Sequence, residues 1–368
     1  MTDQNQAKHI LIITDDWLPN VTGVVRTLSN VKAHVENLGH RVSVIYPDPE
    51  KFVTARILPG HPEITLALWP KSKDAGVARQ LEKLEPDLIY IATPEGPLGL
   101  AAALACRKEE LNYTSGFHTK FPEFAAAFHV PGAMRYGYEY LKWAHGPAHR
   151  IMTPEGMITE LKARGFKNLV PWTRGVNTDL FKPGPSRIYD HLSHPIFLNV
   201  GRVSYEKGLE QFLAAELPGT KVVVGDGPLL QELKVKYPKV VFTGVKHGEE
   251  LAEHYRGADV FAFPSTTDTF GNVQIEALAS GLPVAARVNP ASAKILSAPG
   301  VGAMNTAFQA ACLEALKLKE GGCEDACRQH VMKNYNGWEK TSRLLLENLT
   351  EAKGPRRSKP IRSTLNLG

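Results

Sequence analysis

The stretch from Val260 to Pro283 constrains the fold more than any other part of the sequence. Four apolar residues beginning at Val260 are followed by Pro264 and a short polar loop, and a helical pattern begins near Gly271. Gly281 is placed to end that helix, and Pro283 prevents its continuation. The pattern predicts a strand, a loop and a helix, with the loop at the carboxyl end of a buried strand, where α/β proteins bind ligands.

Two carboxylates lie along this unit, Asp268 in the loop and Glu276 in the helix. At about 1.5 Å per helical residue, the distance from Gly271 to Glu276 is roughly 7 to 8 Å, so the two carboxylates would contact different parts of a long ligand. Between them, the amides of Phe270, Gly271 and Asn272 would form a helix N-terminus that suits a phosphate. The alternative is that Asp268 merely caps a surface helix.

The first half of the chain shows the same strand and helix alternation. Residues 9–14 predict a buried strand, which a loop connects to a helix beginning near Gly23, and residues 41–46 predict the next strand. The loop lacks the GxGxxG pattern of dinucleotide-binding proteins. Gly23 would let an anion approach the backbone closely, and Asn20 lies in the same loop.

A histidine and two cations follow other predicted strands. His118 comes after the strand at residues 113–117, on the edge that Gly23 faces, and could either be structural or hydrogen-bond a ligand. Arg202 and Lys207 flank a glycine-bounded turn after the strand at residues 196–200. An arginine fork and a lysine point charge can neutralise a diphosphate without a metal, and the alternative is that both are solvated surface charges.

Residues 121–157 mix aromatic and basic side chains. They could form two packed helices, or an acceptor or membrane-interface surface, because rings and cations suit lipid headgroups. The segment 352–368 carries five basic residues and no acid, so it is either a disordered end or a weak tether to anionic lipid.

Composition limits the classes of protein that remain. A chain of 368 residues, 43% of them hydrophobic, is long enough for two domains with cores of their own. Lys plus Arg exceeds Asp plus Glu by 43 − 38 = 5, and the five basic residues of the tail account for that whole excess, so a nucleic-acid-binding body is not expected. The four cysteines show no paired spacing, and no signal peptide or membrane-spanning run is evident. We therefore expect a cytoplasmic protein without a structural metal, and a peripheral position at the inner face of the cell membrane is the alternative that the basic tail leaves open.

Several of these motifs together resemble the retaining glycosyltransferases of family 4. The resemblance rests on Asp268 and Glu276 with seven residues between them, on FHTKFPE beginning at Phe117, on the turn of Arg202 and Lys207, and on RGVNTDLF beginning at Arg174. Within the family, the combination of FHTKFPE and RGVNTDLF looks closest to GDP-mannose-dependent alpha-mannosyltransferases and glycolipid-forming members. Asp268 stands where the family usually has glutamate, and residues 289–292 lack the expected glycine-rich turn and glutamate.

The resemblance implies the GT-B architecture, two facing Rossmann-like doubly wound α/β domains with a C-terminal crossover helix. The expected bounds are residues 1–185 for an acceptor domain, 186–335 for a donor-nucleotide domain, 336–351 for the returning helix and 352–368 for the tail.

The implied activity is transfer of a hexosyl group from a UDP- or GDP-sugar to a hydroxyl of a lipid or lipid-linked acceptor such as diacylglycerol, with no cofactor and no metal. The resemblance gives catalytic roles to His118, Arg202, Lys207 and Asp268, and donor-binding roles to Asn20, Gly23, Phe270, Gly271, Asn272 and Glu276. A soluble saccharide acceptor, a sugar-nucleotide epimerase and a non-catalytic nucleotide-sugar-binding protein are the alternatives. The donor base and the oligomeric state are left open.

Overall fold

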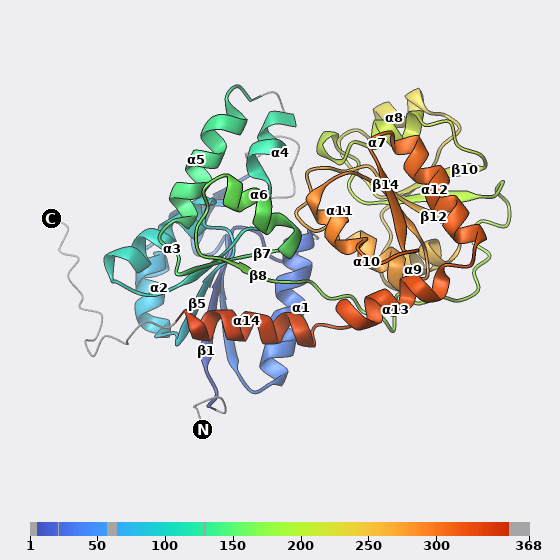
Figure 1. The fold of residues 1–368 in the computed structure, drawn as a ribbon. Coiled ribbons are helices and arrows are strands. Elements are labelled where there is room, and N and C mark those ends of the chain that lie inside the picture. Colours follow the sequence, from blue (N-terminus) through green and yellow to red (C-terminus); the bar gives the residue numbers. More distant parts are fainter. Residues whose placement is uncertain (1–5, 21, 57–64, 128–129, 353–368) are drawn as a thin grey trace.

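The computed structural model describes residues 6–20, 22–56, 65–127 and 130–352, and these form two α/β domains that lie side by side (Figure 1). Each domain is built on a six-stranded sheet whose paired strands are all parallel. The first sheet has the order β2-β1-β5-β6-β7-β8 and the second β11-β10-β9-β12-β13-β14. Both orders reverse direction next to the first strand of the domain, which is the point where doubly wound sheets bind ligands. The predicted fold class is therefore confirmed, and the basic tail lies outside the described residues.

The elements of the first domain follow in chain order. They are β1 (His9–Ile13), α1 (Gly23–Asn37), β2 (Arg41–Ile45), β3 (Phe52–Ala55), β4 (Leu66–Pro70), the 3-10 turn η1 (Lys73–Ala75), α2 (Val77–Leu84), β5 (Leu88–Ile91), α3 (Pro97–Lys108), β6 (Thr114–Gly116), α4 (Phe121–Ala127), α5 (Ala133–His145), β7 (Arg150–Thr153), η2 (Glu155–Met157), α6 (Ile158–Ala163) and β8 (Leu169–Pro171). Strands β3 and β4 form a separate antiparallel ribbon.

The second domain follows the same alternation. Its elements are β9 (Ile196–Val200), η3 (Tyr205–Lys207), α7 (Leu209–Ala214), β10 (Thr220–Val224), α8 (Leu230–Lys236), β11 (Val241–Gly244), α9 (Gly248–Arg256), β12 (Val260–Phe263), α10 (Asn272–Ala279), β13 (Val284–Arg287), α11 (Pro290–Ile295), β14 (Gly302–Asn305), α12 (Phe308–Glu320) and α13 (Glu324–Asn334). A last helix, α14 (Glu339–Glu351), belongs to the first domain.

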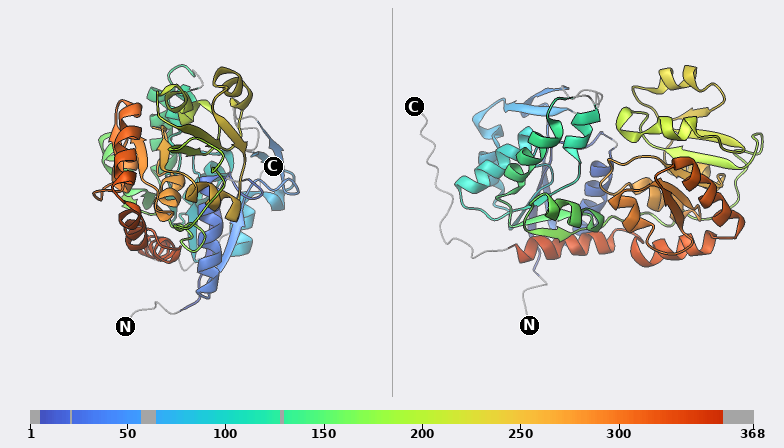
Figure 2. Two further views of the ribbon diagram at one scale, coloured as in Figure 1. Left: turned by 90° about the vertical axis from the view of Figure 1, so that its right-hand side faces the viewer. Right: turned by 45° about the horizontal axis from the view of Figure 1, so that its top comes forward.

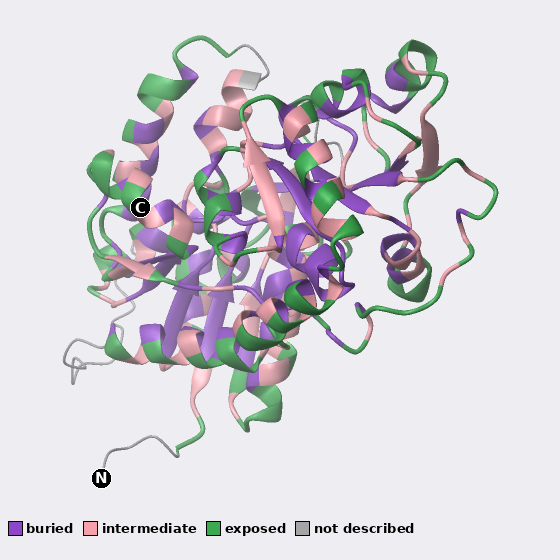
Figure 3. Cartoon of the chain, turned by 45° about the vertical axis from the view of Figure 1, so that its right-hand side comes forward, coloured by how far each residue is buried: buried purple, intermediate pink, exposed green. Residues whose placement is uncertain are grey.

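The central strands are buried because helices cover both faces of each sheet (Figure 3). In β12 all four residues from Val260 to Phe263 are buried, and in β1 every residue from Ile10 to Ile13 is buried. Continuous apolar strands of this kind are what a parallel sheet with two covered faces requires. Because the strands themselves are apolar and buried, the polar side chains that could bind a ligand lie in the loops at the carboxyl ends of the strands.

The chain crosses between the domains twice, and the two crossings touch. Val176 on the outward path and Asn336 on the return path form a parallel bridge, and the amide of Gly337 donates to the carbonyl of Val176 at 3.0 Å. Helix α14 then runs beneath the first sheet beside α1 (Figures 1 and 2). The indole nitrogen of the buried Trp172 donates to the carbonyl of Thr341 at 2.9 Å, which fixes α14 to the first domain. In the part of the chain that the structure describes, no helix has the length and apolar character needed to span a bilayer.

Candidate functional site

The loops after β6 and β12 meet where the two domains face each other. The hydroxyl of Thr269, in the loop after β12, donates to the main-chain carbonyl of His118 at 2.6 Å. Both residues are buried. Nearby, the ammonium of Lys294 on α11 pairs with the carboxylate of Glu155 in η2 at 2.9 Å. The predicted histidine and the predicted helix N-terminus therefore lie in one interdomain site, with the domains in contact.

Asp268 and Lys207 form an ion pair inside this site. The Nζ of Lys207 donates to Oδ1 of Asp268 at 2.7 Å, although the two residues are 61 positions apart. Burial alone would raise the pKa of Asp268, but the charge and hydrogen bond of Lys207 outweigh it and the pKa lies below its ordinary value. The charge of Lys120, from the first domain, acts in the same direction. Asp268 is thus an ionised carboxylate between cations of both domains.

Helix α10 presents its N-terminus to the site without a side-chain cap. Its capping position is Gly271, at φ 82°, and no side chain caps the first turn. A Cβ on Gly271 would lie 2.8 Å from the ring of Phe263. The alternative that Asp268 is an N-capping residue is therefore wrong, because its carboxylate is engaged by Lys207 instead. The first amides of a helix have no intrahelical partner, so this end can receive an anion.

Glu276 lies on the same helix, with a side chain that is only 4% exposed. Its Oε2 accepts from the hydroxyl of Tyr255 at 2.9 Å, and its Oε1 accepts from Arg26 of α1, in the other domain. Burial raises the pKa of Glu276, and the charge of Arg26 and the hydrogen bonds offset part of that rise. The two carboxylates of this unit thus have different partners within the protein, Lys207 for Asp268, and Tyr255 and Arg26 for Glu276.

His118 is buried, and both of its ring nitrogens are engaged within the first domain. Nδ1 accepts from the guanidinium of Arg174 at 2.8 Å, since arginine can only donate, so Nε2 carries the proton and donates to the hydroxyl of Tyr90 at 2.6 Å. Burial and the charge of Arg174 hold the pKa of His118 well below its ordinary value, so the ring is neutral. A Cβ on Gly116 would lie 2.2 Å from the Tyr90 hydroxyl, so a glycine is required there. In this arrangement the main-chain carbonyl of His118, which already binds Thr269, faces the second domain.

Arg202 follows β9 in a turn made by closely packed glycines. A Cβ on Gly225 would lie 1.8 Å from the carbonyl oxygen of Gly201, so the turns after β9 and β10 pack backbone on backbone. Burial lowers the pKa of Arg202, and the charge of Glu206 opposes that shift. Arg202 and Lys207 are five residues apart in the sequence and belong to the same turn after β9.

The loop after β1 reaches the same site from the first domain. A Cβ on Gly23 would lie 3.6 Å from the side-chain amide nitrogen of Asn272, the first residue of α10. The side chain of Asn20 donates to Oδ1 of Asp16 at 2.8 Å, and Thr22, which caps α1, donates to Oδ2. Gly23 is therefore placed beside the α10 N-terminus, whereas Asn20 helps to shape the loop that carries it.

The structure adds residues that the sequence analysis missed. Arg26, Tyr255, Arg174 and Tyr90 surround the predicted residues, and each contacts one of them directly. Arg174 lies within the recognised RGVNTDLF string, so its position could have been noticed. Nothing in the sequence pairs Arg26 with Glu276, because 250 positions separate them.

A second group of buried acids lies at the carboxyl ends of β1 and β5. Asp15 accepts from the amides of Leu98 and Gly99 at 2.8 and 2.9 Å, at the start of α3, and burial raises its pKa to about 6. Burial also raises the pKa of Glu95 to about 8, and its Oε2 lies 3.7 Å from Nε2 of His145. Glu95 is accordingly a neutral acid over much of the physiological range.

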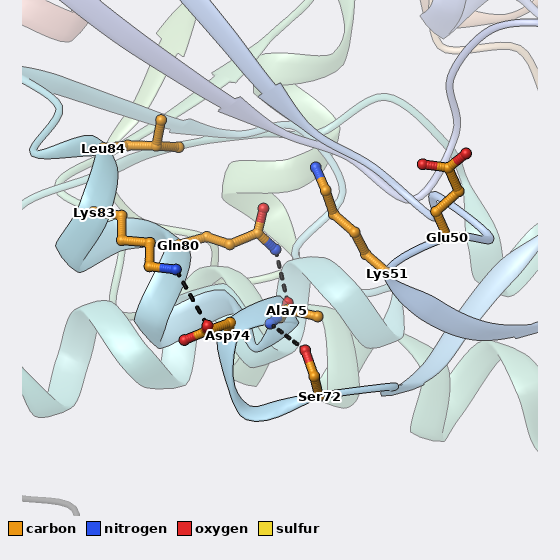
Figure 4. A pocket seen from close by; sticks show the side chains of 8 residues that line it. All are labelled: Glu50, Lys51, Ser72, Asp74, Ala75, Gln80, Lys83 and Leu84. Atoms are coloured by element: carbon orange, nitrogen blue, oxygen red, sulfur yellow. Dashed lines mark hydrogen bonds and ion pairs between the residues drawn. The ribbon is translucent and has the colours of Figure 1, made fainter.

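A hollow on the outer edge of the first domain lies away from this site (Figure 4). It is lined by both charge signs, and Asp74 pairs with Lys83 at 3.4 Å while Gln80 donates to the carbonyl of Ala75 at 2.7 Å. None of the predicted residues lines it. Among the described residues, no three His, Cys, Asp or Glu side chains gather in an arrangement that could hold a metal ion.

Helices α4 and α5 come from the aromatic and basic segment. Their inner residues pack as a helix pair, with Tyr138 and Leu141 of α5 buried. Three large apolar or aromatic side chains of α5 are nevertheless exposed, Met134, Tyr136 and Trp143, and the guanidinium of Arg135 lies 5.5 Å from the centre of the Tyr136 ring. Both expectations for this segment are thus compatible with its structure.

Known proteins are similar to this chain in sequence and in fold. The family described as Glycosyltransferase Family 4 matches residues 21–180, and that described as Glycosyl transferases group 1 matches residues 194–317. A GDP-mannose-dependent alpha-mannosyltransferase of Mycobacterium tuberculosis is 32% identical over 297 residues, which cover 75% of this chain and 78% of that protein. An alpha-monoglucosyldiacylglycerol synthase of Streptococcus pneumoniae is 27% identical over 332 residues, 80% of this chain and 74% of that protein. Among solved structures, a sucrose-phosphate synthase from Thermosynechococcus elongatus matches with a TM-score of 0.72 and 20% identity, over 94% of this chain and 100% of that one.

Proposed function

Because the chain belongs to the glycosyltransferases of family 4 and is therefore an enzyme that uses a nucleotide sugar, we propose that it moves a hexosyl group to a lipid hydroxyl with retention of configuration. The donor is a UDP- or GDP-sugar, and the acceptor is a lipid or lipid-linked alcohol such as diacylglycerol. The observation that carries this proposal is the ion pair of Lys207 and Asp268 beside the uncapped N-terminus of α10, in the contact zone of the two domains.

In this proposal the donor diphosphate lies against the second domain. Lys207 and Arg202 from the turn after β9 and the first amides of α10 after β12 are positive or positively polarised groups, and together they stabilise the negative charge that develops on the departing phosphate. The bond between the anomeric carbon and the phosphate oxygen breaks while the acceptor oxygen forms a bond to that carbon on the same face. The acceptor proton leaves with the diphosphate. No metal is assigned a role, because the two cations and the helix supply the charge.

The remaining predicted residues hold the rest of the donor. The carboxylate of Glu276 accepts hydrogen bonds from the ribose, and the carboxylate of Asp268 contacts the transferred sugar. Gly23, which has no side chain, lets the diphosphate approach the main chain of the first domain. The imidazole of His118 is neutral and both of its nitrogens are hydrogen-bonded, so it is not suited to act as a nucleophile. We assign it a positioning role: these bonds fix the loop after β6, whose His118 carbonyl accepts from Thr269.

A lipid acceptor is supported by two observations. Relatives include the alpha-monoglucosyldiacylglycerol synthase of Streptococcus pneumoniae, whose name states a diacylglycerol product. Helix α5 exposes Met134, Tyr136 and Trp143, and Arg135 lies over the Tyr136 ring, a composition that suits lipid headgroups. The mannosyltransferases among the relatives make GDP-mannose the first donor to test.

The test incubates the purified protein with UDP- and GDP-sugars, with and without vesicles that contain diacylglycerol or a lipid extract. We expect release of nucleoside diphosphate with one class of donor only when lipid is present, together with a new α-linked glycolipid. Equal release with a soluble saccharide and no lipid would replace the lipid acceptor with a soluble one. Conversion of the donor into another sugar nucleotide would favour an epimerase, and binding without turnover would favour a non-catalytic protein.

Lys207→Ala tests the role of the ion pair. Loss of one charge-assisted contact to the phosphate should reduce kcat/KM for the donor by about ten- to hundredfold, since such a bond contributes about 1.5 to 3 kcal/mol. Lys236→Ala is the matched control, because its ammonium pairs with Glu210 on the exposed surface of the same domain. Unchanged donor kinetics in Lys207→Ala at low donor concentration would show that the phosphate assignment is wrong.

A further inference from the structure

The contact between Arg26 and Glu276 joins the donor carboxylate to the other domain. Arg26 lies on α1 three positions after Gly23, so it follows the loop that faces the α10 N-terminus on the same side of the helix. Its guanidinium donates to Oε1 of Glu276, and the side chain is about one third exposed, at 36%. The carboxylate it binds is 4% exposed.

A carboxylate at this depth requires partners, because an unpaired buried charge is strongly unfavourable. Glu276 receives one hydrogen bond on each oxygen, from Arg26 on Oε1 and from Tyr255 on Oε2. Tyr255 is a neutral donor from α9 of the same domain, and Arg26 is the cation. The ionised form and the orientation of Glu276 therefore depend on a residue of the first domain.

These two contacts leave acceptor capacity on the carboxylate. Each carboxylate oxygen has two lone pairs, so each can accept a further hydrogen bond from a ligand hydroxyl. Arg26 and Tyr255 hold the group in place and do not use up its acceptors. A pair of vicinal hydroxyls, as in a ribose, matches two such oxygens.

We propose that Arg26 is a positioning residue of the donor site, which orients Glu276 for the ribose hydroxyls and thereby completes the ribose subsite only when the domains are in contact. This inference rests on the proposed function, since it concerns the same donor. By linkage, a donor that binds the completed subsite more tightly also favours the closed arrangement of the domains. The first domain thus contributes to donor affinity through Arg26.

The experiment measures binding of UDP, GDP and their 2′-deoxyribose forms by titration calorimetry, which needs no acceptor and no turnover. The unaltered protein should bind one of the two nucleotides and bind its deoxy form about ten- to hundredfold more weakly, as expected for loss of a hydrogen bond to a charged group. In Arg26→Ala the ribonucleotide should weaken by a similar factor, while the deoxy form changes little, so that the preference between them disappears. Glu276→Gln should show the same loss of preference, and the double variant should be no worse than either single one.

Two controls separate this effect from damage to the fold. Lys32→Ala lies on the same helix and breaks an exposed ion pair with Glu36 within α1, so it should leave the preference intact. Arg26→Lys should recover part of the preference, because it restores the charge but not the fork geometry. Thermal unfolding of each variant shows whether the domains remain folded.

Other outcomes would overturn the inference. Tighter nucleotide binding in Arg26→Ala would mean that Arg26 competes with the ribose, and equal weakening of both nucleotide forms would mean that it contacts the phosphates. Unchanged binding would exclude any role in the donor site. If the unaltered protein binds neither UDP nor GDP, the proposed function itself fails, and that result is distinct from a failure of the Arg26 assignment alone.

Discussion

One buried side chain of the first domain, Glu95, makes the stability of the protein depend on pH. Glu95 has a carboxyl whose pKa burial raises to about 8, and the nearby charge of Asp15 acts in the same direction. The other groups around it are the imidazole of His145, whose pKa burial lowers to about 3, and Tyr140, whose hydroxyl donates to the Glu95 carbonyl at 2.6 Å. The folded protein therefore holds a proton on Glu95 that the unfolded chain releases at a lower pH.

Glu95→Gln should remove this dependence. A folded-state pKa above the unfolded one gives stability that is complete below about pH 4.5 and is lost as the pH rises through about 8. Glutamine mimics the protonated acid, so the variant should gain about 2 to 4 kcal/mol over the unaltered protein at pH 8 and little at pH 5. Chemical denaturation at both pH values measures the gap, with Glu232→Gln on the exposed surface as control. A gap that does not change with pH would contradict the assignment.

At the scale of elements, the sequence predicted what local patterns determine. The apolar run of β12, the glycine at the end of α10 and the basic turn after β9 all follow from spacing along a few residues, and these elements are found where expected. The ribbon of β3 and β4 was not anticipated, because its two strands are short and pair only with each other. The contact of Arg26 with Glu276 joins residues 250 positions apart, which no local pattern encodes. The roles assigned to the site residues remain predictions that the experiments above test.

One guanidinium of helix α13 (Arg328) binds three main-chain carbonyls outside that helix, in addition to the apolar contacts that α13 makes with the core of the second domain. Arg328 donates to the carbonyls of Phe181 at 2.7 Å, Ala279 at 3.0 Å and Thr178 at 2.9 Å. It thus joins α13 to the carboxyl end of α10 and to the segment between the domains. A cation suits the end of α10, where the helix dipole is negative.

Arg328→Met should keep much of the apolar stem and leave these carbonyls without their donor. Loss of the charged hydrogen bonds should lower the free energy of unfolding by about 2 to 3 kcal/mol, since their contributions do not add fully. Lys333→Met on the exposed side of the same helix is the matched control and should change stability by less than about 0.5 kcal/mol. Equal stability of the two variants in denaturant titrations would show that the three bonds contribute little.

At the scale of the whole molecule, the arrangement of the two domains depends on the point where the two interdomain segments touch, at Gly175 and Gly337. A Cβ on Gly175 would lie 1.8 Å from the carbonyl oxygen of Gly337, whereas a Cβ on Gly337 would meet no atom within 4 Å. Gly337 adopts φ 60°, so an alanine there is strained but has room. Gly175 is thus required because a side chain would collide with the opposite segment, whereas Gly337 is favoured because of its left-handed backbone conformation.

Gly175→Ala should force the crossings apart and change how the domains meet. We expect a larger radius of gyration in small-angle X-ray scattering and a loss of transfer activity of at least about tenfold, because a small displacement of the reacting groups is costly. Gly337→Ala should cost only about 1 kcal/mol of stability and leave the radius unchanged. Should both variants scatter and react like the unaltered protein, the crossing does not control the domain arrangement.

The bridge between Val176 and Asn336 means that the second domain enters and leaves the first at a single point. In terms of the polypeptide, the second domain is an insert whose two ends meet, and the first domain is formed by two separate segments, the later of which contains α14. The second domain could therefore be exchanged as one continuous segment, because its two ends lie next to each other at Val176 and Asn336. If the proposed function holds, recombination there would exchange the donor-binding domain and leave α4 and α5 of the first domain unchanged.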